Sequence, residues 1–242
     1  MGGRIKMRII FIRHAEPDYS IDSLTEKGVS EAVALNKRIL GWKDDIDYYC
    51  SPLGRARLTC EIGLNNTGRE AETLLWLREF DYLVKDENGS LRIPWDFMPS
   101  YWTSDEKLLS YDKWSSAEIM KTGDIEKEYA KLIEEFDGLL EKYGYKRNGK
   151  IYEFNEHSDK TIVFFCHMGV SFMLMGHLLN ISPISLIHGM CMLPSSLSIL
   201  QTEEREKRIA SFRATAIGDT THLHMDGKKL SSMGYFAKVF QG

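Results

Sequence analysis

Two short runs of the chain are continuously apolar and rich in β-branched and aromatic residues: residues 9–12 (Ile-Ile-Phe-Ile) and residues 162–166 (Ile-Val-Phe-Phe-Cys). A strand with one face in water alternates apolar and polar residues, so these runs predict strands that are covered on both faces. Covering both faces of a sheet requires helices on each side of it. This feature constrains the chain to an α/β architecture with a buried sheet.

The first part of the chain contains sequence patterns that are typical of two helices and a short strand. Thr25 can cap a helix whose apolar residues recur at helical spacing. Residues 47–50 predict a short strand, and Ser51-Pro52 after it suits the N-cap and first residue of a helix that runs to about residue 64. The residues expected to face the core from the helix after Thr25 are Val29, Ala32, Val33, Ile39 and Leu40.

The second half of the chain continues the same pattern. Residues 125–143 carry a long amphipathic stripe, which predicts a helix. Residues 169–179 are apolar on nearly all sides, which predicts a buried helix. Residues 197–200 and 209–217 predict a β-hairpin, with the charged residues 202–207 expected as its solvated turn.

The alternation of strands and helices predicts a three-layer α/β/α sandwich with a mostly parallel central sheet. The length of 242 residues fits one large domain, and we expect a single domain over residues 1–242. Residues 81–123 break this alternation and predict an insertion packed over the sheet. We expect about half of its aromatic residues to pack in the core and the rest to line a substrate pocket. Its aromatic residues are Tyr82, Trp95, Phe97, Tyr101, Trp102, Tyr111 and Trp114.

Composition excludes several classes of partner. The chain has 31 Lys and Arg against 35 Asp and Glu, a net charge of −4, so neither nucleic acid nor a membrane is an expected partner. None of the 4 cysteines forms a Cys-x-x-Cys pair, and we expect them as buried thiols. The apolar run at 9–12 is too short for a signal peptide core, and no stretch is long enough to cross a bilayer. We therefore expect a cytoplasmic protein.

Polar side chains follow three of the predicted strands at the point where each strand ends. Arg13 and His14 come after the first run, Arg55 lies shortly after the strand at 47–50, and His167 follows Cys166. Ligands of open α/β sheets bind outside the carboxyl ends of the strands, where helix N-termini add free N–H groups. Two arginines and two histidines at these ends suit a dianion such as a phosphate ester.

These residues lie in motifs that resemble the histidine phosphatase superfamily, which includes the phosphoglycerate mutases. Six segments occur in the order that the family has them, and together they cover most of the chain outside residues 81–160. They are Ile12-Arg13-His14-Ala15-Glu16, Leu24-Thr25-Glu26-Lys27-Gly28, Ser51-Pro52-Leu53-Gly54-Arg55-Ala56 with Thr59, Leu77-Arg78-Glu79, His167-Met168-Gly169-Val170, and Gly218-Asp219 with His222-Leu223. The resemblance implies a phosphoglycerate mutase-like fold and a small phosphomonoester as substrate.

The resemblance also implies a role for each site residue. His14 is the expected nucleophile, which forms a phosphohistidine intermediate. Arg13 and Arg55 are expected to bind the phosphoryl oxygens, and His167 to donate to the same oxygens as charge builds up. Glu79 is the expected general acid that protonates the leaving group. No cofactor and no metal is expected, because cations already surround the phosphoryl group.

Departures from the motifs leave alternatives open. Ala15 and Met168 stand where the family often has glycine, and Leu83 stands where its phosphatase members often have glycine. Asp81 is therefore a rival of Glu79 for the general acid. The alternative functions are a phosphoglycerate mutase-like phosphotransferase and a non-catalytic binder of a phosphorylated ligand. A metal pair at His222 and His224 is disfavoured, because no cluster of ligands at suitable spacing accompanies it.

Overall fold

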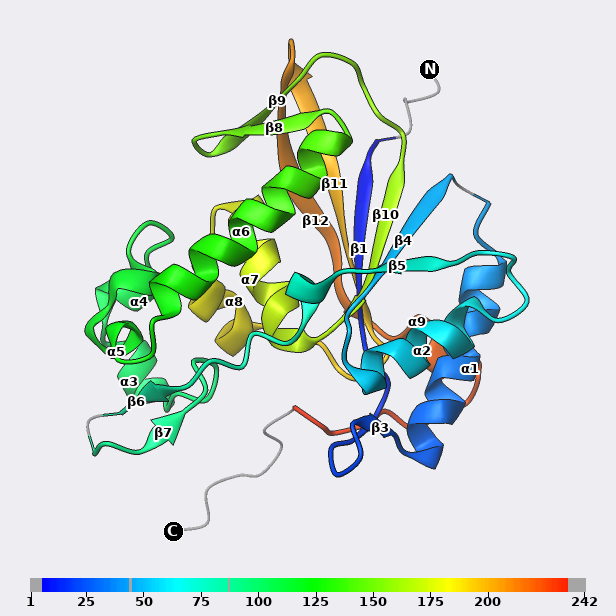
Figure 1. Ribbon diagram of the computed structural model, residues 1–242, viewed down its shortest axis with the longest axis horizontal. Coiled ribbons are helices and arrows are strands. Elements are labelled where there is room, and N and C mark those ends of the chain that lie inside the picture. The colour runs from blue at the N-terminus through cyan, green and yellow to red at the C-terminus, as the bar shows by residue number, and fades with distance from the viewer. Residues whose placement is uncertain (1–5, 44, 87, 235–242) are drawn as a thin grey trace.

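The computed structural model describes residues 6–43, 45–86 and 88–234 (Figure 1). The outer bounds of the predicted domain, residues 1 and 242, lie outside the described residues. At the centre is an eight-stranded sheet. Its order is β5 (Ala71–Thr73), β4 (Ile46–Cys50), β10 (Thr161–Cys166), β1 (Arg8–Arg13), β11 (Leu197–Glu206), β12 (Ile209–Asp219), β9 (Ile151–Phe154) and β8 (Tyr145–Asn148).

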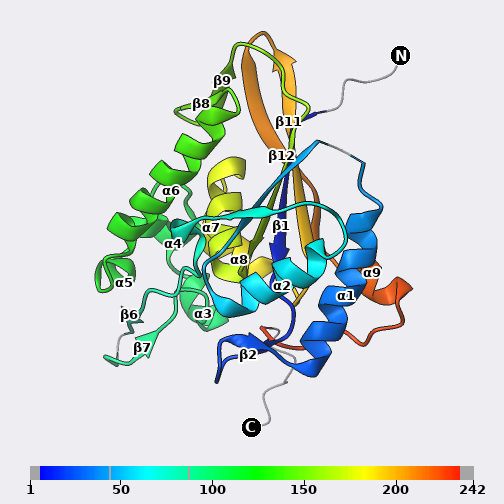
Figure 2. The same ribbon diagram turned by 45° about the vertical axis from the view of Figure 1, so that its right-hand side comes forward.

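The first four strands of this order are parallel, and β11, β12, β9 and β8 extend the sheet in antiparallel fashion. The helices α1 (Glu26–Leu40) and α2 (Gly54–Leu64) cover one face of the parallel part. The helices α6 (Ile125–Lys142) and α7 (Met168–Leu179) cover the other face (Figures 1 and 2). The predicted three-layer α/β fold with a mostly parallel core is confirmed.

Alternate residues of the two apolar runs explain why both faces are covered. Ile9 and Phe11 of β1 join the core formed with α6 and α7, as does Phe164 of β10. Ile10 and Phe165 point to the other side and pack with α1 and α2. Since successive side chains of a strand face opposite ways, a continuous apolar run can pack only between two layers.

The insertion at residues 81–123 consists of short elements that pack against α6 and against α8 (Pro183–Gly189). Its buried side chains, which include Phe97, Leu108 and Trp114, belong to the same core as the face covered by α7. The elements are β6 (Val84–Lys85), β7 (Leu91–Arg92), α3 (Pro99–Trp102), α4 (Glu106–Leu109), the 3₁₀ helix η2 (Trp114–Ser116) and α5 (Glu118–Lys121). The remaining short elements are β2 (Pro17–Asp18), β3 (Ser23–Leu24), η1 (Leu75–Leu77) and α9 (Thr221–Met225).

The predicted buried face of α1 was partly wrong. Thr25 caps the helix as expected, since its hydroxyl accepts from the Gly28 N–H. Val29, Val33 and Leu40, however, are exposed. The helix packs Gly28 against the backbone that leads into β2. A Cβ on Gly28 would lie 2.2 Å from the Glu16 carbonyl oxygen. This contact fixes the rotation of the helix and leaves those three apolar residues in water.

The predicted turn of the hairpin was also wrong. Residues 202–206 belong to β11, and the turn is the pair Lys207 and Arg208, where Arg208 has a φ of +63°. The charged residues remain in the strand because they find partners beside it: Glu203 pairs with Arg213 at 2.8 Å. In the part of the chain that the structure describes, no helix has the length and apolar composition that a membrane span requires.

Candidate active site

The carboxyl ends of β1, β4 and β10 meet at one edge of the sheet, because these strands are parallel neighbours. The backbone N–H of His14 donates to the Cys166 carbonyl at 2.9 Å, and that of Ser51 donates to the Phe165 carbonyl at 2.9 Å. The residues that follow the three strands are therefore held in register beyond the strand ends. The structure brings together His14, His167, Arg13 and Arg55, as the sequence predicted.

His14 is held in a single tautomer. Its Nδ1 lies 2.8 Å from the Ala15 carbonyl oxygen, and a ring nitrogen can bond a carbonyl only as a donor. The proton therefore resides on Nδ1, and Nε2 keeps its lone pair. Burial, with the charge of Arg13 as the next cause, lowers the pKa of His14 to about 3. The imidazole is thus neutral and nucleophilic across the physiological range.

His167 lies next to His14, with ring centroids 5.2 Å apart. It is the N-cap residue of α7 and is fully buried. Its Nε2 lies 2.7 Å from the Ser51 hydroxyl oxygen, whereas its Nδ1 has no hydrogen-bond partner among the described residues. Burial and the nearby charges of Arg55 and Arg13 lower the pKa of His167 well below its usual value, so this ring is neutral as well.

Each arginine is anchored by one end of its guanidinium group. Arg13 donates from Nη1 to the Met192 carbonyl at 2.6 Å and to the Met233 carbonyl at 3.1 Å. Arg55 donates from Nη1 to the Asp22 carboxylate. The anchors hold the two guanidinium groups in place and leave the buried Nε atom of each without a hydrogen-bond partner in the described part of the chain.

Three residues of this cluster each hold a buried nitrogen atom without a hydrogen-bond partner among the described residues: Nε of Arg13, Nε of Arg55 and Nδ1 of His167. A buried donor without an acceptor costs free energy, about 1–3 kcal/mol each. The cost disappears when an anion with several acceptor oxygens binds between them. A tetrahedral dianion beside His14 would supply such acceptors.

Glu79 lies at the N-terminus of α7. Its Oε1 accepts from the N–H groups of Val170 and Phe80, each at 2.9 Å, and its Oε2 accepts from Gly169 at 3.3 Å. Burial raises the pKa of Glu79, and these three hydrogen bonds oppose the rise. These bonds hold Glu79 against the backbone that directly follows His167. Its rival Asp81 is exposed.

Trp95 is the residue of the insertion that reaches this carboxyl group. A Cβ on Gly169 would lie 2.7 Å from Glu79 Oε1 and 2.8 Å from Trp95 Cη2. Both side chains therefore press against the glycine, and only glycine fits there. Other aromatic residues of the insertion pack elsewhere: Trp114 against Tyr129, with ring centroids 4.7 Å apart, in the core.

The departures from the family motifs are accommodated without loss of the site. Ala15 is fully buried and donates from its N–H to the Thr59 hydroxyl at 3.0 Å. Met168 places its sulfur 3.9 Å from Arg13 Nη1. Leu83 is partly exposed and lies outside the cluster of charged residues. Ala15 and Met168, the two departures next to the histidines, thus form part of the walls of the site.

The thiol of Cys166 and the imidazoles of His222 and His224 have other surroundings. Cys166 contacts the Ser171 hydroxyl, and burial raises the pKa of its thiol to about 12, so it is no nucleophile. His222 contacts Ser195, and His224 is exposed. Among the described residues no three His, Cys, Asp or Glu side chains form a group that could hold a metal ion.

Three residues of the site escaped the sequence analysis. Ser51 contacts His167 instead of capping α2, whose N-cap is Leu53, so the predicted start of that helix was wrong. Asp22 has a φ of +47° and binds both Arg55 and the Gly54 N–H. Tyr19 lies under the Arg55 guanidinium, 5.4 Å from its carbon to the ring centroid. Only the position of Ser51 in the arginine motif could have signalled a role.

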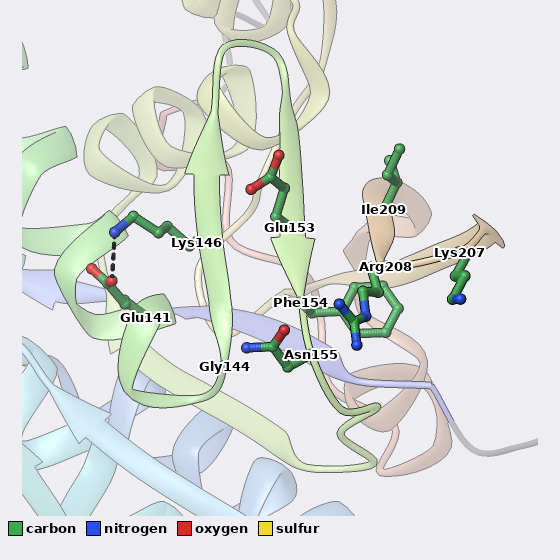
Figure 3. Close-up of a pocket in the computed structure, with 9 residues that line it drawn as sticks. All are labelled: Glu141, Gly144, Lys146, Glu153, Phe154, Asn155, Lys207, Arg208 and Ile209. Carbon is green, nitrogen blue, oxygen red and sulfur yellow. Dashed lines mark ion pairs between the residues drawn. The ribbon is translucent and has the colours of Figure 1, made fainter.

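A separate groove of about 610 Å³ lies at the opposite end of the sheet, between the end of α6, β9 and the β11–β12 turn (Figure 3). Glu141 and Lys146 form an ion pair of 3.2 Å at its edge. The groove contains none of the predicted site residues, so it is not part of this site. Its lining residues are Glu141, Gly144, Lys146, Glu153, Phe154, Asn155, Lys207, Arg208 and Ile209.

Comparison with known proteins confirms the resemblance found in the motifs. Residues 9–90 match the family described as the histidine phosphatase superfamily (branch 1). This stretch contains His14, both site arginines and Glu79, whereas His167 lies beyond it and is brought to the site by the fold. No curated protein is significantly similar to this sequence.

Several solved structures with the same fold are phosphatases by name. A phosphoserine phosphatase from Entamoeba histolytica, in complex with 3-phosphoglyceric acid, has a TM-score of 0.56 and 18% identity over 90% of this chain and 99% of its own. An α-ribazole phosphatase from Shigella flexneri has a TM-score of 0.52 and 19% identity over 88% and 99%. A mycobacterial glucosyl-3-phosphoglycerate phosphatase in complex with VO3 has a TM-score of 0.53 and 17% identity over 88% and 99%.

Proposed function

We propose that this chain, whose residues 9–90 match the histidine phosphatase superfamily, hydrolyses small phosphomonoesters through a phosphohistidine intermediate on His14. One observation carries the proposal. Arg13 and His167, which are buried, and Arg55, which is partly buried, each hold an unpartnered nitrogen atom, and they lie beside a neutral imidazole whose Nε2 is free to attack. A cationic cradle around a neutral nucleophile is the arrangement that phosphoryl transfer requires.

The reaction follows in two steps. In the first, Nε2 of His14 attacks phosphorus, a P–N bond forms, and the P–O bond to the leaving group breaks. Glu79 gives its proton to the departing alkoxide, while Arg13 and Arg55 bind the oxygens of the transferring group. In the second, Glu79 takes a proton from water, the water oxygen attacks phosphorus, and the P–N bond breaks to release phosphate and His14.

The first test is turnover of a generic aryl phosphate, such as p-nitrophenyl phosphate, before and after exhaustive chelation with EDTA. We expect hydrolysis at an unchanged rate, because the cationic side chains neutralise the phosphoryl charge without a metal. Loss of activity on chelation, with recovery on adding a divalent cation, would instead indicate a metallophosphatase. Tight binding of phosphate without turnover of any phosphomonoester would favour a non-catalytic binder.

Hydrolysis is preferred over mutase activity because the insertion offers few cations for a substrate carboxylate. Residues 94–120 contain Lys107 and Lys113 but no arginine. The two arginines on either side of residues 94–120 are engaged elsewhere: Arg92 binds Asp86 at 2.6 Å, and Arg147 binds Asn180 at 2.7 Å. Near the site the insertion presents Trp95, an apolar wall.

We therefore expect hydrolysis of aryl and other hydrophobic phosphomonoesters, with little conversion of 3-phosphoglycerate to 2-phosphoglycerate even when bisphosphoglycerate is supplied. Both activities are to be measured on one preparation. The Trp95→Ala variant should lower kcat/KM for an aryl phosphate by roughly tenfold, because an aromatic contact is lost. The matched control Trp102→Ala, whose ring stacks on His188 at 5.0 Å, should leave it unchanged.

A mutase rate above the hydrolysis of every phosphomonoester tried would overturn this preference. In that case Arg78 is the residue to replace first. It is exposed beside Glu79, and its charge acts on His167, so it is placed to contact a second anionic group of the substrate.

A further inference from the structure

The two ring nitrogens of His167 have different surroundings. Nε2 lies 2.7 Å from the Ser51 hydroxyl oxygen, and Nδ1 is buried without a partner among the described residues. A neutral imidazole carries its proton on one nitrogen only, so the other nitrogen is an acceptor. Which of the two carries the proton decides whether His167 offers the phosphoryl group an N–H donor or a lone pair.

The hydrogen bonds of Ser51 determine that choice. Ser51 is fully buried, and its hydroxyl oxygen accepts from the Leu53 N–H at 3.3 Å. In the described structure the only acceptor near the hydroxyl hydrogen is Nε2 of His167. A buried hydroxyl hydrogen left without an acceptor is costly, so Ser51 donates to Nε2. Nε2 then accepts, and the proton of His167 resides on Nδ1.

We propose that Ser51 is a positioning residue that holds His167 as the neutral Nδ1–H tautomer and thereby presents an N–H donor to the phosphoryl group. The proposal rests on the proposed function only for the identity of that ligand. The tautomer itself follows from the contacts of Ser51.

The two histidines of the site are thus the same neutral tautomer, with the proton on Nδ1 and the lone pair on Nε2, but each uses a different nitrogen to hold the ring in place. On His14 the Ala15 carbonyl accepts from Nδ1–H, so Nε2 has a lone pair for attack. On His167 the Ser51 hydroxyl donates to Nε2, so Nδ1–H is available to stabilise charge. One neutral ring is therefore a nucleophile and the other a donor, although burial disfavours the charged form of both. The nitrogen that each ring leaves for the phosphoryl group, rather than its charge, divides their roles.

The direct test is ¹⁵N NMR of the histidine side chains at pH 7, with the His167 signals assigned by their loss in a His167→Gln variant. We expect the wild-type protein to show a protonated Nδ1 and an unprotonated Nε2 at His167. In Ser51→Ala this preference should be lost, because Nε2 no longer has a donor. Ser51→Thr keeps the hydroxyl and should restore it. A protonated Nε2 in the wild-type protein would overturn the proposal without any variant.

Binding of orthovanadate gives a second, independent readout. Ser51→Ala should weaken it about tenfold, since a donor to a charged oxygen is lost for part of the population. The matched control is Ser182→Ala, a buried serine whose hydroxyl donates to the Leu108 carbonyl in the insertion. It should change neither the tautomer nor the affinity. Unchanged His167 tautomers in a folded Ser51→Ala protein would refute the role of Ser51, whereas absence of any phosphatase activity would refute only the proposed function.

Discussion

Replacement of His14 with alanine is expected to lower the turnover of every phosphomonoester by roughly 10⁴-fold or more, as loss of a covalent nucleophile does in other enzymes. The reason is that Nε2 of His14 is the neutral nucleophile beside the phosphoryl cradle, held by the Nδ1 bond to the Ala15 carbonyl. The fold should survive, because the strands and both cores are formed by other residues. Steady-state kinetics and circular dichroism check the two statements.

The covalent intermediate gives a sharper measurement of the same residue. Brief reaction with a ³²P-labelled substrate should leave a label that is labile in acid and stable in base, and this label should be absent from His14→Ala. The control is His224→Ala, which removes an exposed imidazole from α9. It should keep both turnover and label. Retained turnover in a folded His14→Ala protein would contradict the mechanism.

The fold was predictable because its strongest signals are local. The runs in β1 and β10 are apolar at every position, and such runs require layers on both sides. The rotation of α1 was not predictable, since it depends on the approach of Gly28 to Glu16, a contact between separate segments. The strands β8 and β9 were not recognised, because Lys146, Arg147 and Glu153 give them a polar composition at the edge of the sheet.

The residues of the site were predictable to different degrees for the same reason: some follow local patterns, and others depend on contacts between distant segments. His14 and His167 follow their strands directly, so the sequence located them once the strands were recognised. Their supports lie far away along the chain: Ser51 contacts His167 across 116 positions, and Asp22 contacts Arg55 across 33. A serine in front of a helix has the pattern of an N-cap, and only the three-dimensional arrangement shows that its hydroxyl is used elsewhere.

Replacement of Glu79 with glutamine should suppress hydrolysis of an alkyl phosphate by about 10²- to 10³-fold and should largely spare p-nitrophenyl phosphate. An alkoxide needs a proton to leave, whereas nitrophenolate leaves readily without one. Burial raises the pKa of Glu79, so its acid form persists to higher pH than that of an ordinary carboxyl group. In the wild-type protein kcat/KM for the alkyl substrate should therefore fall as the pH rises through this raised pKa. The fall should be absent from Glu79→Gln.

Glutamine is a suitable replacement because both short hydrogen bonds of the carboxyl group end on one oxygen. The N–H groups of Val170 and Phe80 donate to Oε1, which the amide oxygen of glutamine can replace. Only the longer contact of Oε2 with the Gly169 N–H is lost, so the variant tests the proton rather than the position. The matched control is Asp81→Asn, which should affect both substrates little, since Asp81 is exposed. Equal loss of both activities in Glu79→Gln would make Glu79 a positioning residue at the N-terminus of α7. A selective loss of the alkyl substrate in Asp81→Asn would transfer the role of general acid to Asp81.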